Sequence, residues 1–246
     1  AQGATLPTAR YDALLINWNA QNPFDGLSPD FGSSTYSAAS AAARANLIST
    51  DGWTIADSGT ADLVMTVATT GAGETFTLPA QDADVFSATI YWGDGQSDPI
   101  TAFDDADLTH TYAAAGDHVV SITGDFPNIY FNNGGDTAKV KSVENLGVMG
   151  WTQLDDAFHG CLNMTSFVAG NTDTSLVTTM QHMFRECSSL TTLDVSSFDT
   201  SIVTDMSSMF IFCDDLTTLD VTGFNTSLVA TMSFMFRGCG NLTALD

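Results

Sequence analysis

A 26-residue period recurs through the C-terminal part of the chain and restricts the folds that it can form. The four cysteines, Cys161, Cys187, Cys213 and Cys239, follow one another at this spacing. Other apolar residues repeat with the same spacing: Phe158, Phe184, Phe210 and Phe236; Met164, Leu190, Leu216 and Leu242; Phe167, Leu193, Leu219 and Leu245. A unit of this length cannot bury its apolar face alone, so neighbouring copies must stack on a shared core.

Each repeat contains two patterns of apolar residues. In residues 190–198 the spacing is that of a strand followed by a turn, whereas residues 203–210 have helical spacing. Ser201 or Thr204 can cap a short helix there. The sequence therefore predicts a strand followed by a helix in every repeat, with the strands in a parallel ladder about 4.8 Å apart.

Residues 187–213 carry a Leu-Thr-x-Leu-Asp-Val-x-x-Phe-Asp-Thr-Ser-x-Val-x-x-Met-x-x-Met-Phe pattern. This pattern closely resembles the BspA-like leucine-rich-repeat surface proteins, and the resemblance covers about residues 150–246. The first copy departs from it at residues 168–172, as expected of a degraded edge repeat. The resemblance implies a leucine-rich-repeat solenoid in 127–246, whose N-terminal end residues 127–150 would cap, and a surface protein associated with adhesion.

The middle of the chain, residues 60–126, shows alternating strand patterns separated by Gly and Asp turns. Trp92-Gly93-Asp94-Gly95 and the run His110–Ile122 resemble the signature of PKD (polycystic kidney disease) domains. That resemblance implies a small β-sandwich that acts as an extracellular spacer and is not catalytic.

The first segment, residues 1–59, shows helical patterns at Ala9–Ala20 and Ala38–Ser49 and a strand pattern at Gly52–Ile55. It resembles the closing module that follows repeat arrays in the same family. The predicted fold class is thus multidomain α+β: a helical closing module (1–59), a PKD-like β-sandwich (60–126) and a strand-helix solenoid (127–246).

The charge balance excludes one class of partner. Six basic residues face 29 acidic ones, for a formal net charge of −23, which argues against binding of nucleic acid. No apolar run is long enough for a membrane span. We expect a secreted or cell-surface protein that does not insert into the membrane, and whose leader or anchor has been removed or lies outside this sequence.

The cysteine column and the histidines give no clear catalytic signal. Buried thiols are the favoured interpretation of the cysteines, with disulfides or a bound metal as alternatives, although no Cys-x-x-Cys pair supports zinc. His110, His118, His159 and His182 are scattered, and no activated Ser or Cys motif accompanies them. The sequence therefore predicts a protein that is not an enzyme.

Two columns of polar residues are candidate binding positions on the strands. They are Thr191, Thr217 and Thr243, and Asp194, Asp220 and Asp246. Stacked carboxylates repel one another unless something compensates. Each Asp could accept hydrogen bonds from the backbone of the next turn, or the columns could form a ligand face, a calcium site or a regular threonine array of the ice-binding kind.

Asp104, Asp105 and Asp107 form an acidic loop in the middle segment. Carboxylates are suitable calcium ligands, but this spacing matches no known calcium loop, so a solvated loop is the favoured interpretation. Calcium is the one cofactor that the sequence suggests.

These observations predict a non-enzymatic surface adhesin that binds a protein or glycan of another surface through the solenoid face. The alternative is a structural subunit of a surface fibre or layer. In that case Leu242 and Leu245, at an uncapped edge, would dock head-to-tail on the N-terminal module of another copy of the chain.

Overall fold

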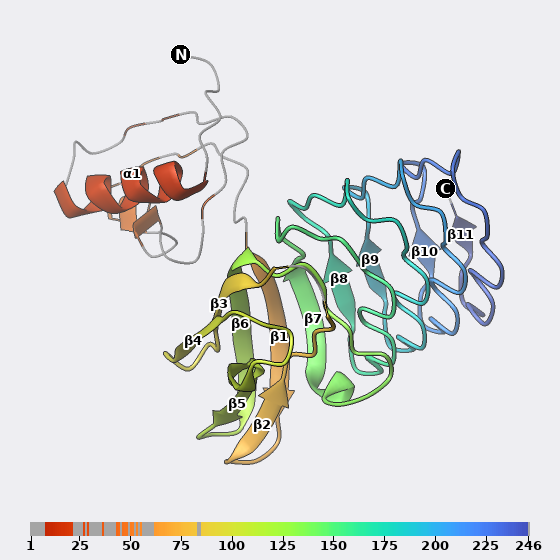
Figure 1. Cartoon of the computed structure of the whole chain (residues 1–246), viewed down its shortest axis with the longest axis horizontal. Helices are drawn as coiled ribbons and strands as arrows, with labels where there is room; N and C mark the ends of the chain where they lie inside the picture. Colours follow the sequence, from red (N-terminus) through yellow and green to blue (C-terminus); the bar gives the residue numbers. More distant parts are fainter. Residues whose placement is uncertain are drawn as a thin grey trace. The chain divides into compact units, whose positions relative to one another are not determined.

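The computed structural model describes residues 8–21, 27, 29, 36, 43, 44, 46–48, 50, 51, 53, 55, 62–82 and 85–245. The chain divides into two compact units, residues 1–62 and 63–246 (Figure 1). No helix within the described ranges is both long and apolar enough to cross a bilayer.

The first unit contains helix α1 (Thr8–Gln21) and a helical segment at residues 43, 44 and 46–48. Leu15, Leu47 and Trp53 form its small core, and the rings of Trp18 and Trp53 lie 5.3 Å apart between centroids. Of the strand expected at 52–55, the two described residues, 53 and 55, are not in a strand. The backbone N–H of Trp53 instead donates to the carbonyl of Leu47 (3.0 Å).

The second unit is built on a seven-stranded sheet in the order β4-β3-β6-β1-β7-β8-β9. The strands are β1 (Leu63–Thr69), β3 (Ser87–Tyr91), β4 (Ser97–Ile100), β6 (Gly116–Asp125), β7 (Val140–Asn145), β8 (Ser166–Val168) and β9 (Thr192–Asp194). A pair, β2 (Glu74–Thr77) and β5 (Thr109–Tyr112), and a second pair, β10 (Thr218–Leu219) and β11 (Ala244–Leu245), complete the strands. Two 3-10 turns, η1 (Ala106–Leu108) and η2 (Thr137–Lys139), precede β5 and β7.

Strand β1 is the middle strand of this sheet. Every second side chain of it is buried, so one of its faces lies on the core. It pairs antiparallel with β6 on one side and with β7 on the other. Strand β7 then pairs in parallel with β8, the first strand of the repeats. One hydrophobic cluster runs from Leu63 to Met235. The predicted separation into a β-sandwich and a solenoid is therefore wrong, because the two segments share one sheet and one core.

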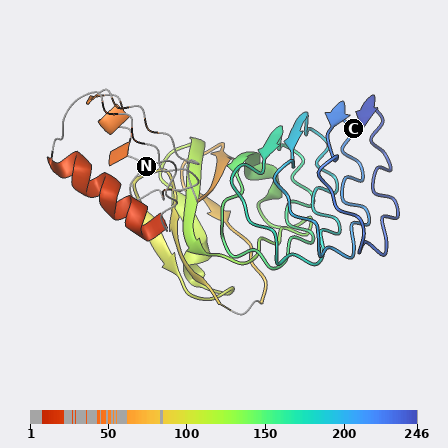
Figure 2. The same ribbon diagram turned by 90° about the horizontal axis from the view of Figure 1, so that it is seen from above.

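The repeats stack in register along the chain, as Figures 1 and 2 show for the segments from β8 to β11. Phe158, Phe184, Phe210 and Phe236 form one column, with successive ring centroids 6.0, 5.8 and 5.6 Å apart and planes within 8° of parallel. Leu190 and Leu216 are fully buried in the same core. The 26-residue period thus places like side chains directly above one another.

The predicted α+β fold class with a strand-helix solenoid is wrong, because the fold is mainly β. Residues 203–210, like their equivalents in the other described repeats, form turns and no helix. Alternate backbone N–H groups donate to the next repeat: Met180 to Asp205, His182 to Ser207, Phe184 to Met209 and Glu186 to Ile211, at 2.8–3.1 Å. A helix would use these donors within its own segment, so the bonds between repeats replace it.

Left-handed residues make this backbone path possible. His182 and Glu186 have φ of 58° and 61°, and Ser208 and Phe212 at the equivalent positions have φ of 56° and 61°. A positive φ at every fourth residue interrupts any right-handed helix. The apolar residues of 203–210 have helical spacing although no helix forms. In this succession of turns, as in a helix, the side chain of every third or fourth residue faces the core.

The shared core can be tested by shortening one of its side chains. We expect Leu190→Ala to lower the free energy of unfolding by about 2–5 kcal/mol, because it leaves a cavity between repeats. Leu176 is 64% exposed, so Leu176→Ala should change it by less than about 0.5 kcal/mol. Urea denaturation of both variants measures the difference, and equal losses would contradict this placement of the two side chains.

Candidate functional site

The predicted threonine column lies on the surface of the repeat stack. Thr191, Thr217 and Thr243 are all exposed. The Thr191 hydroxyl donates to the carbonyl of Thr165 (3.0 Å), and the Thr243 hydroxyl donates to that of Thr217 (3.2 Å). Because the hydroxyl protons of Thr191 and Thr243 are used between repeats, the oxygens of these two side chains can offer only acceptor capacity to a ligand.

The aspartate column is also exposed, with Asp194 at the end of β9 and Asp220 directly after β10, whereas the threonines directly precede the strands. Asp194 Oδ1 accepts hydrogen bonds from the backbone N–H and hydroxyl of Ser196 (3.0 and 2.7 Å), and Asp220 Oδ1 accepts the same pair from Thr222 (2.9 and 2.7 Å). The expectation that each Asp accepts from the backbone of the turn that follows is therefore confirmed for Asp194 and Asp220, whose carboxylates accept from the N–H two residues further on. Asp246 lies outside the described residues.

The hydrogen bonds of Asp220 also act on its pKa. The hydroxyl of Thr222, and then its backbone N–H, lower the pKa of Asp220 from its ordinary value. The carboxylate remains ionised at neutral pH, and its Oδ2 has no role in the turn. The exposed strand face therefore presents acceptors and negative charge at fixed positions.

The acidic loop has a local structural role. Asp105 caps η1 by accepting from the backbone N–H of Asp107 (3.2 Å), and it accepts from the backbone N–H and hydroxyl of Thr101 (3.2 and 3.3 Å). Asp104 and Asp107 are exposed. Among the described residues, no group of three or more His, Cys, Asp or Glu side chains is placed to hold a metal ion.

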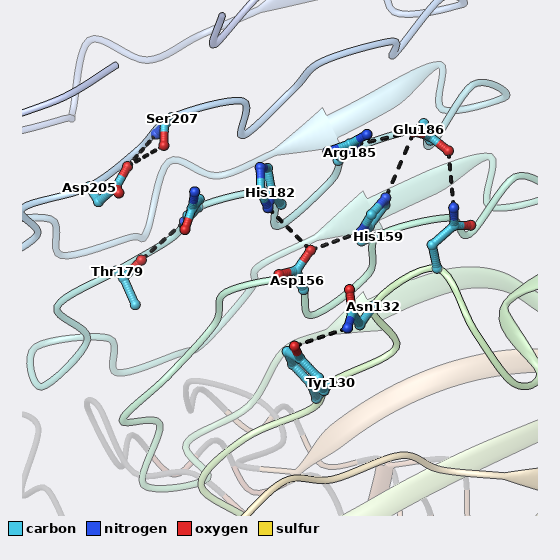
Figure 3. Close-up of polar contacts among 12 residues, drawn as sticks. Tyr130, Asn132, Asp156, His159, Thr179, His182, Arg185, Glu186, Asp205 and Ser207 are labelled. Atoms are coloured by element: carbon cyan, nitrogen blue, oxygen red, sulfur yellow. Dashed lines mark hydrogen bonds and ion pairs between the residues drawn. The ribbon is translucent and has the colours of Figure 1, made fainter. Parts of the chain in front are cut away.

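A polar cluster that the sequence did not predict lies between the first two repeats (Figure 3). Asp156 Oδ1 lies 2.8 Å from His159 Nδ1 and 3.4 Å from His182 Nδ1. On the other side of His159, its Nε2 lies 3.8 Å from Glu186 Oε1. Asp156 and His159 come from one repeat, and His182 and Glu186 from the next.

The backbone explains why these residues meet. Asp156 and His182 occupy the same position in successive repeats, and both have left-handed φ, of 52° and 58°. Asp and His tolerate this conformation better than most residues. The 26-residue spacing between Asp156 and His182 could have revealed the pair, whereas His159 is offset from that register by three residues.

The cluster brings titratable side chains of two adjacent repeats together. The His159 side chain is buried, and its Nε2 has no hydrogen-bond partner in the described part of the chain. A proton on this nitrogen would face Glu186, so that the imidazolium would lie between two carboxylates of adjacent repeats. No hydrogen bond joins either imidazole of the cluster to a hydroxyl or thiol among the described residues.

Burial and charge act in opposite directions on the two neighbouring carboxyls. Burial tends to raise the pKa of Asp156, but the hydrogen bond from His159 and the charges of both histidines outweigh it, so the pKa is lowered. Burial, followed by the charge of Asp156, raises the pKa of Asp155. Burial and the same two carboxylates also raise the pKa of Tyr130, which accepts a hydrogen bond from Asn132 (3.0 Å).

The cysteines are free thiols in this structure. Cys161, Cys187 and Cys213 are buried, and Cys239 is half-buried. The Sγ of Cys187 donates to the carbonyl of Phe158 and that of Cys213 to the carbonyl of Phe184, both at 3.2 Å. Burial raises the pKa of all four thiols and keeps them protonated at neutral pH, and it also shields Cys161, Cys187 and Cys213 from reagents.

The carboxyl of Asp156 gives a pH prediction. Because its folded pKa is lowered, it contributes stability above the ordinary carboxyl pKa and loses it as the pH falls through the folded value. We expect Asp156→Asn to be less stable than the unmodified chain at pH 6, by roughly 1–3 kcal/mol. The deficit should shrink as the pH falls below about 4 in a series of urea titrations.

Asp155→Asn is the matched control for that series. The folded pKa of Asp155 is raised, so its charge costs stability at pH 6 and its removal should be neutral or stabilising. A loss of stability at Asp155→Asn as large as at Asp156→Asn would contradict the opposite signs of the two shifts.

Burial of the thiols gives a second prediction. We expect iodoacetamide at pH 8 to label Cys239 first in the folded protein, and the three buried thiols only after unfolding in guanidinium. Mass spectrometry of peptides at timed intervals measures the order. Rapid labelling of Cys187 in the folded state would show that the repeats open locally.

One comparison with known proteins concerns the repeats. The family model described as "Mycoplasma protein of unknown function, DUF285" matches residues 152–244. This span is less than half of the 246-residue chain. No curated protein and no solved structure matches the chain. The repeat segment is therefore similar to a family whose own function is unknown.

Proposed function

We propose that this chain is a non-catalytic binding module of an extracellular surface protein, which holds a ligand on the exposed strand face of its repeats. The observation that carries this proposal is the pair of exposed Thr and Asp columns, each fixed by hydrogen bonds of its own residues. The BspA-like pattern of residues 187–213 supports it, since that family is associated with adhesion.

The chemistry of the face indicates the kind of ligand. The carboxylate of Asp220 is ionised, and the hydroxyl protons of Thr191 and Thr243 are used inside the stack. A ligand must therefore supply donors, such as the hydroxyls of a glycan or the amide and ammonium groups of a protein. Because the backbone already orders these side chains, little rotamer entropy is lost on binding.

A screen of glycans and surface proteins tests the proposal. The variant Asp194→Asn/Asp220→Asn keeps the Oδ1 acceptor of each turn and removes two charges, and Thr191→Val/Thr217→Val keeps the shape of the side chain. We expect either variant to weaken binding of a screened ligand by about tenfold or more, which corresponds to about 1.4 kcal/mol.

The control is Asp104→Asn/Asp107→Asn, which removes the same charge from the exposed acidic loop. It should leave the affinity within about twofold. The proposal fails if no ligand binds, or if the control weakens binding as much as the face variants do. Light scattering of the same samples distinguishes ligand binding from self-assembly of the chain.

A further inference from the structure

A row of exposed aliphatic side chains runs along the turns of the repeat stack, on residues other than those of the strand face. Leu176, Ile202 and Leu228 follow the 26-residue period and are 64%, 37% and 56% exposed. Exposure is not confined to the ends of the row, because Ile202, its middle member, is 37% exposed although Leu176 and Leu228 lie in the repeats on either side. We call these three residues the aliphatic row.

Each of these side chains lies at the third position of a tight turn. The backbone N–H of Val177 donates to the carbonyl of Thr174 (3.0 Å), and the same bond joins Val203 to Thr200 and Val229 to Thr226 (3.1 Å each). Val177 and Val203 are buried on one side of the tip, and Thr174 and Thr200 on the other. Because the first and fourth residues of these two turns are buried, the third residue, at the tip of each turn, is exposed to solvent.

Hydrogen bonds between repeats make the turns rigid. The Thr174 hydroxyl donates to the carbonyl of Asp199 (3.0 Å) and accepts from its backbone N–H (2.8 Å). The Thr200 hydroxyl makes the equivalent pair of bonds with Asn225 (3.2 and 2.7 Å). Beyond the tips, the backbone N–H of Thr204 donates to the carbonyl of Thr178 (2.9 Å). The aliphatic row is therefore held in place before any partner arrives.

Carboxylates accompany the row. Asp173 and Asp199 begin the turns that carry Leu176 and Ile202, and each accepts from the backbone N–H two residues on (3.0 and 2.9 Å). Hydrogen bonds from the hydroxyl and backbone of Ser201 hold the pKa of Asp199 below its ordinary value. Apolar tips flanked by fixed negative charges, on a chain of net charge −23, complement a partner that is both apolar and basic.

The spacing of the tips selects the shape of that partner. Neighbouring repeats in such a ladder lie about 4.8 Å apart. Residues three or four apart on a helix advance about 4.5–6 Å along its axis, whereas side chains on one face of a strand repeat about every 6.6–6.8 Å. An amphipathic helix that lies along the row therefore matches its spacing better than a strand does.

We propose that Leu176, Ile202 and Leu228 form a docking surface for a basic amphipathic helix of a partner protein, whose apolar residues contact the aliphatic row and whose Lys or Arg side chains meet Asp173 and Asp199. This surface shares no residue with the proposed ligand face, so it does not rest on the proposed function. Shortening the side chains of the aliphatic row should weaken binding of such a helix, because the row is exposed and already ordered before binding.

Binding of a labelled 21-residue helix of Leu and Lys, measured by fluorescence anisotropy in 150 mM NaCl, tests the proposal. Two further peptides each lack one feature. In the first, every Leu is replaced by Ser, and in the second, every Lys is replaced by Glu. We expect the Leu/Lys helix to bind at least tenfold more tightly than either. We expect Leu176→Ser/Ile202→Ser/Leu228→Ser to remove that advantage, and Asp173→Asn/Asp199→Asn to weaken binding and its dependence on salt.

The control variant is Val85→Ser/Val119→Ser, which removes exposed aliphatic side chains that lie outside the repeats and should leave binding within twofold. Asn225 already occupies the equivalent turn position in the third repeat, so the two Asp→Asn changes keep the turn. Unchanged binding by the triple serine variant, or equal binding of the Leu/Glu helix, would overturn the proposal. Binding to phosphatidylcholine vesicles that requires the row, without binding to the peptide, would overturn it in favour of a lipid surface.

Discussion

The hydrogen bonds that run from each repeat to the next are the constraint on which the second unit depends. In the turn half of the repeat, alternate N–H groups donate to carbonyls of the following repeat, such as Phe184 to Met209 and Phe210 to Met235. One added or missing residue would shift every later donor away from its acceptor. The strict 26-residue period therefore follows from the backbone, and the side-chain columns follow from the period.

Because the backbone repeats in register, any property of one position is multiplied along the stack. Inside, this gives the parallel Phe column and the protonated thiols. Outside, it gives the Thr and Asp columns and the aliphatic row, whereas the cluster of Asp156, His159, His182 and Glu186 occurs once, between the first two repeats (Figure 3). Hydrogen bonds within and between repeats hold the turns that carry both sets of exposed residues.

The sequence predicts those residues of the candidate site that recur with the 26-residue period. The exposure of Asp194 was predictable because it alternates with inward-facing Leu193 and Val195, and that of Thr191 because a polar residue recurs there in every repeat. The burial of the cysteines was predictable because they recur with the same period as the apolar residues of the core. The backbone partner of Asp194 was also predictable, because an Asp before a turn commonly accepts from the N–H two residues further on. His159 was missed because it is out of register with His182.

The sequence by itself determined the repeat, the stacking of like residues, the acidic charge and the identity of the core positions, because these depend only on period and side-chain type. The tertiary structure decided where each backbone donor goes. The backbone N–H groups of residues such as His182 and Ser208 could donate within a helix or to a carbonyl of the next repeat. They donate to the next repeat because the stacked neighbour places a carbonyl opposite each of them. The same stacking decided that β8 extends the sheet of β1 and β7, which joins the middle segment and the repeats around one core.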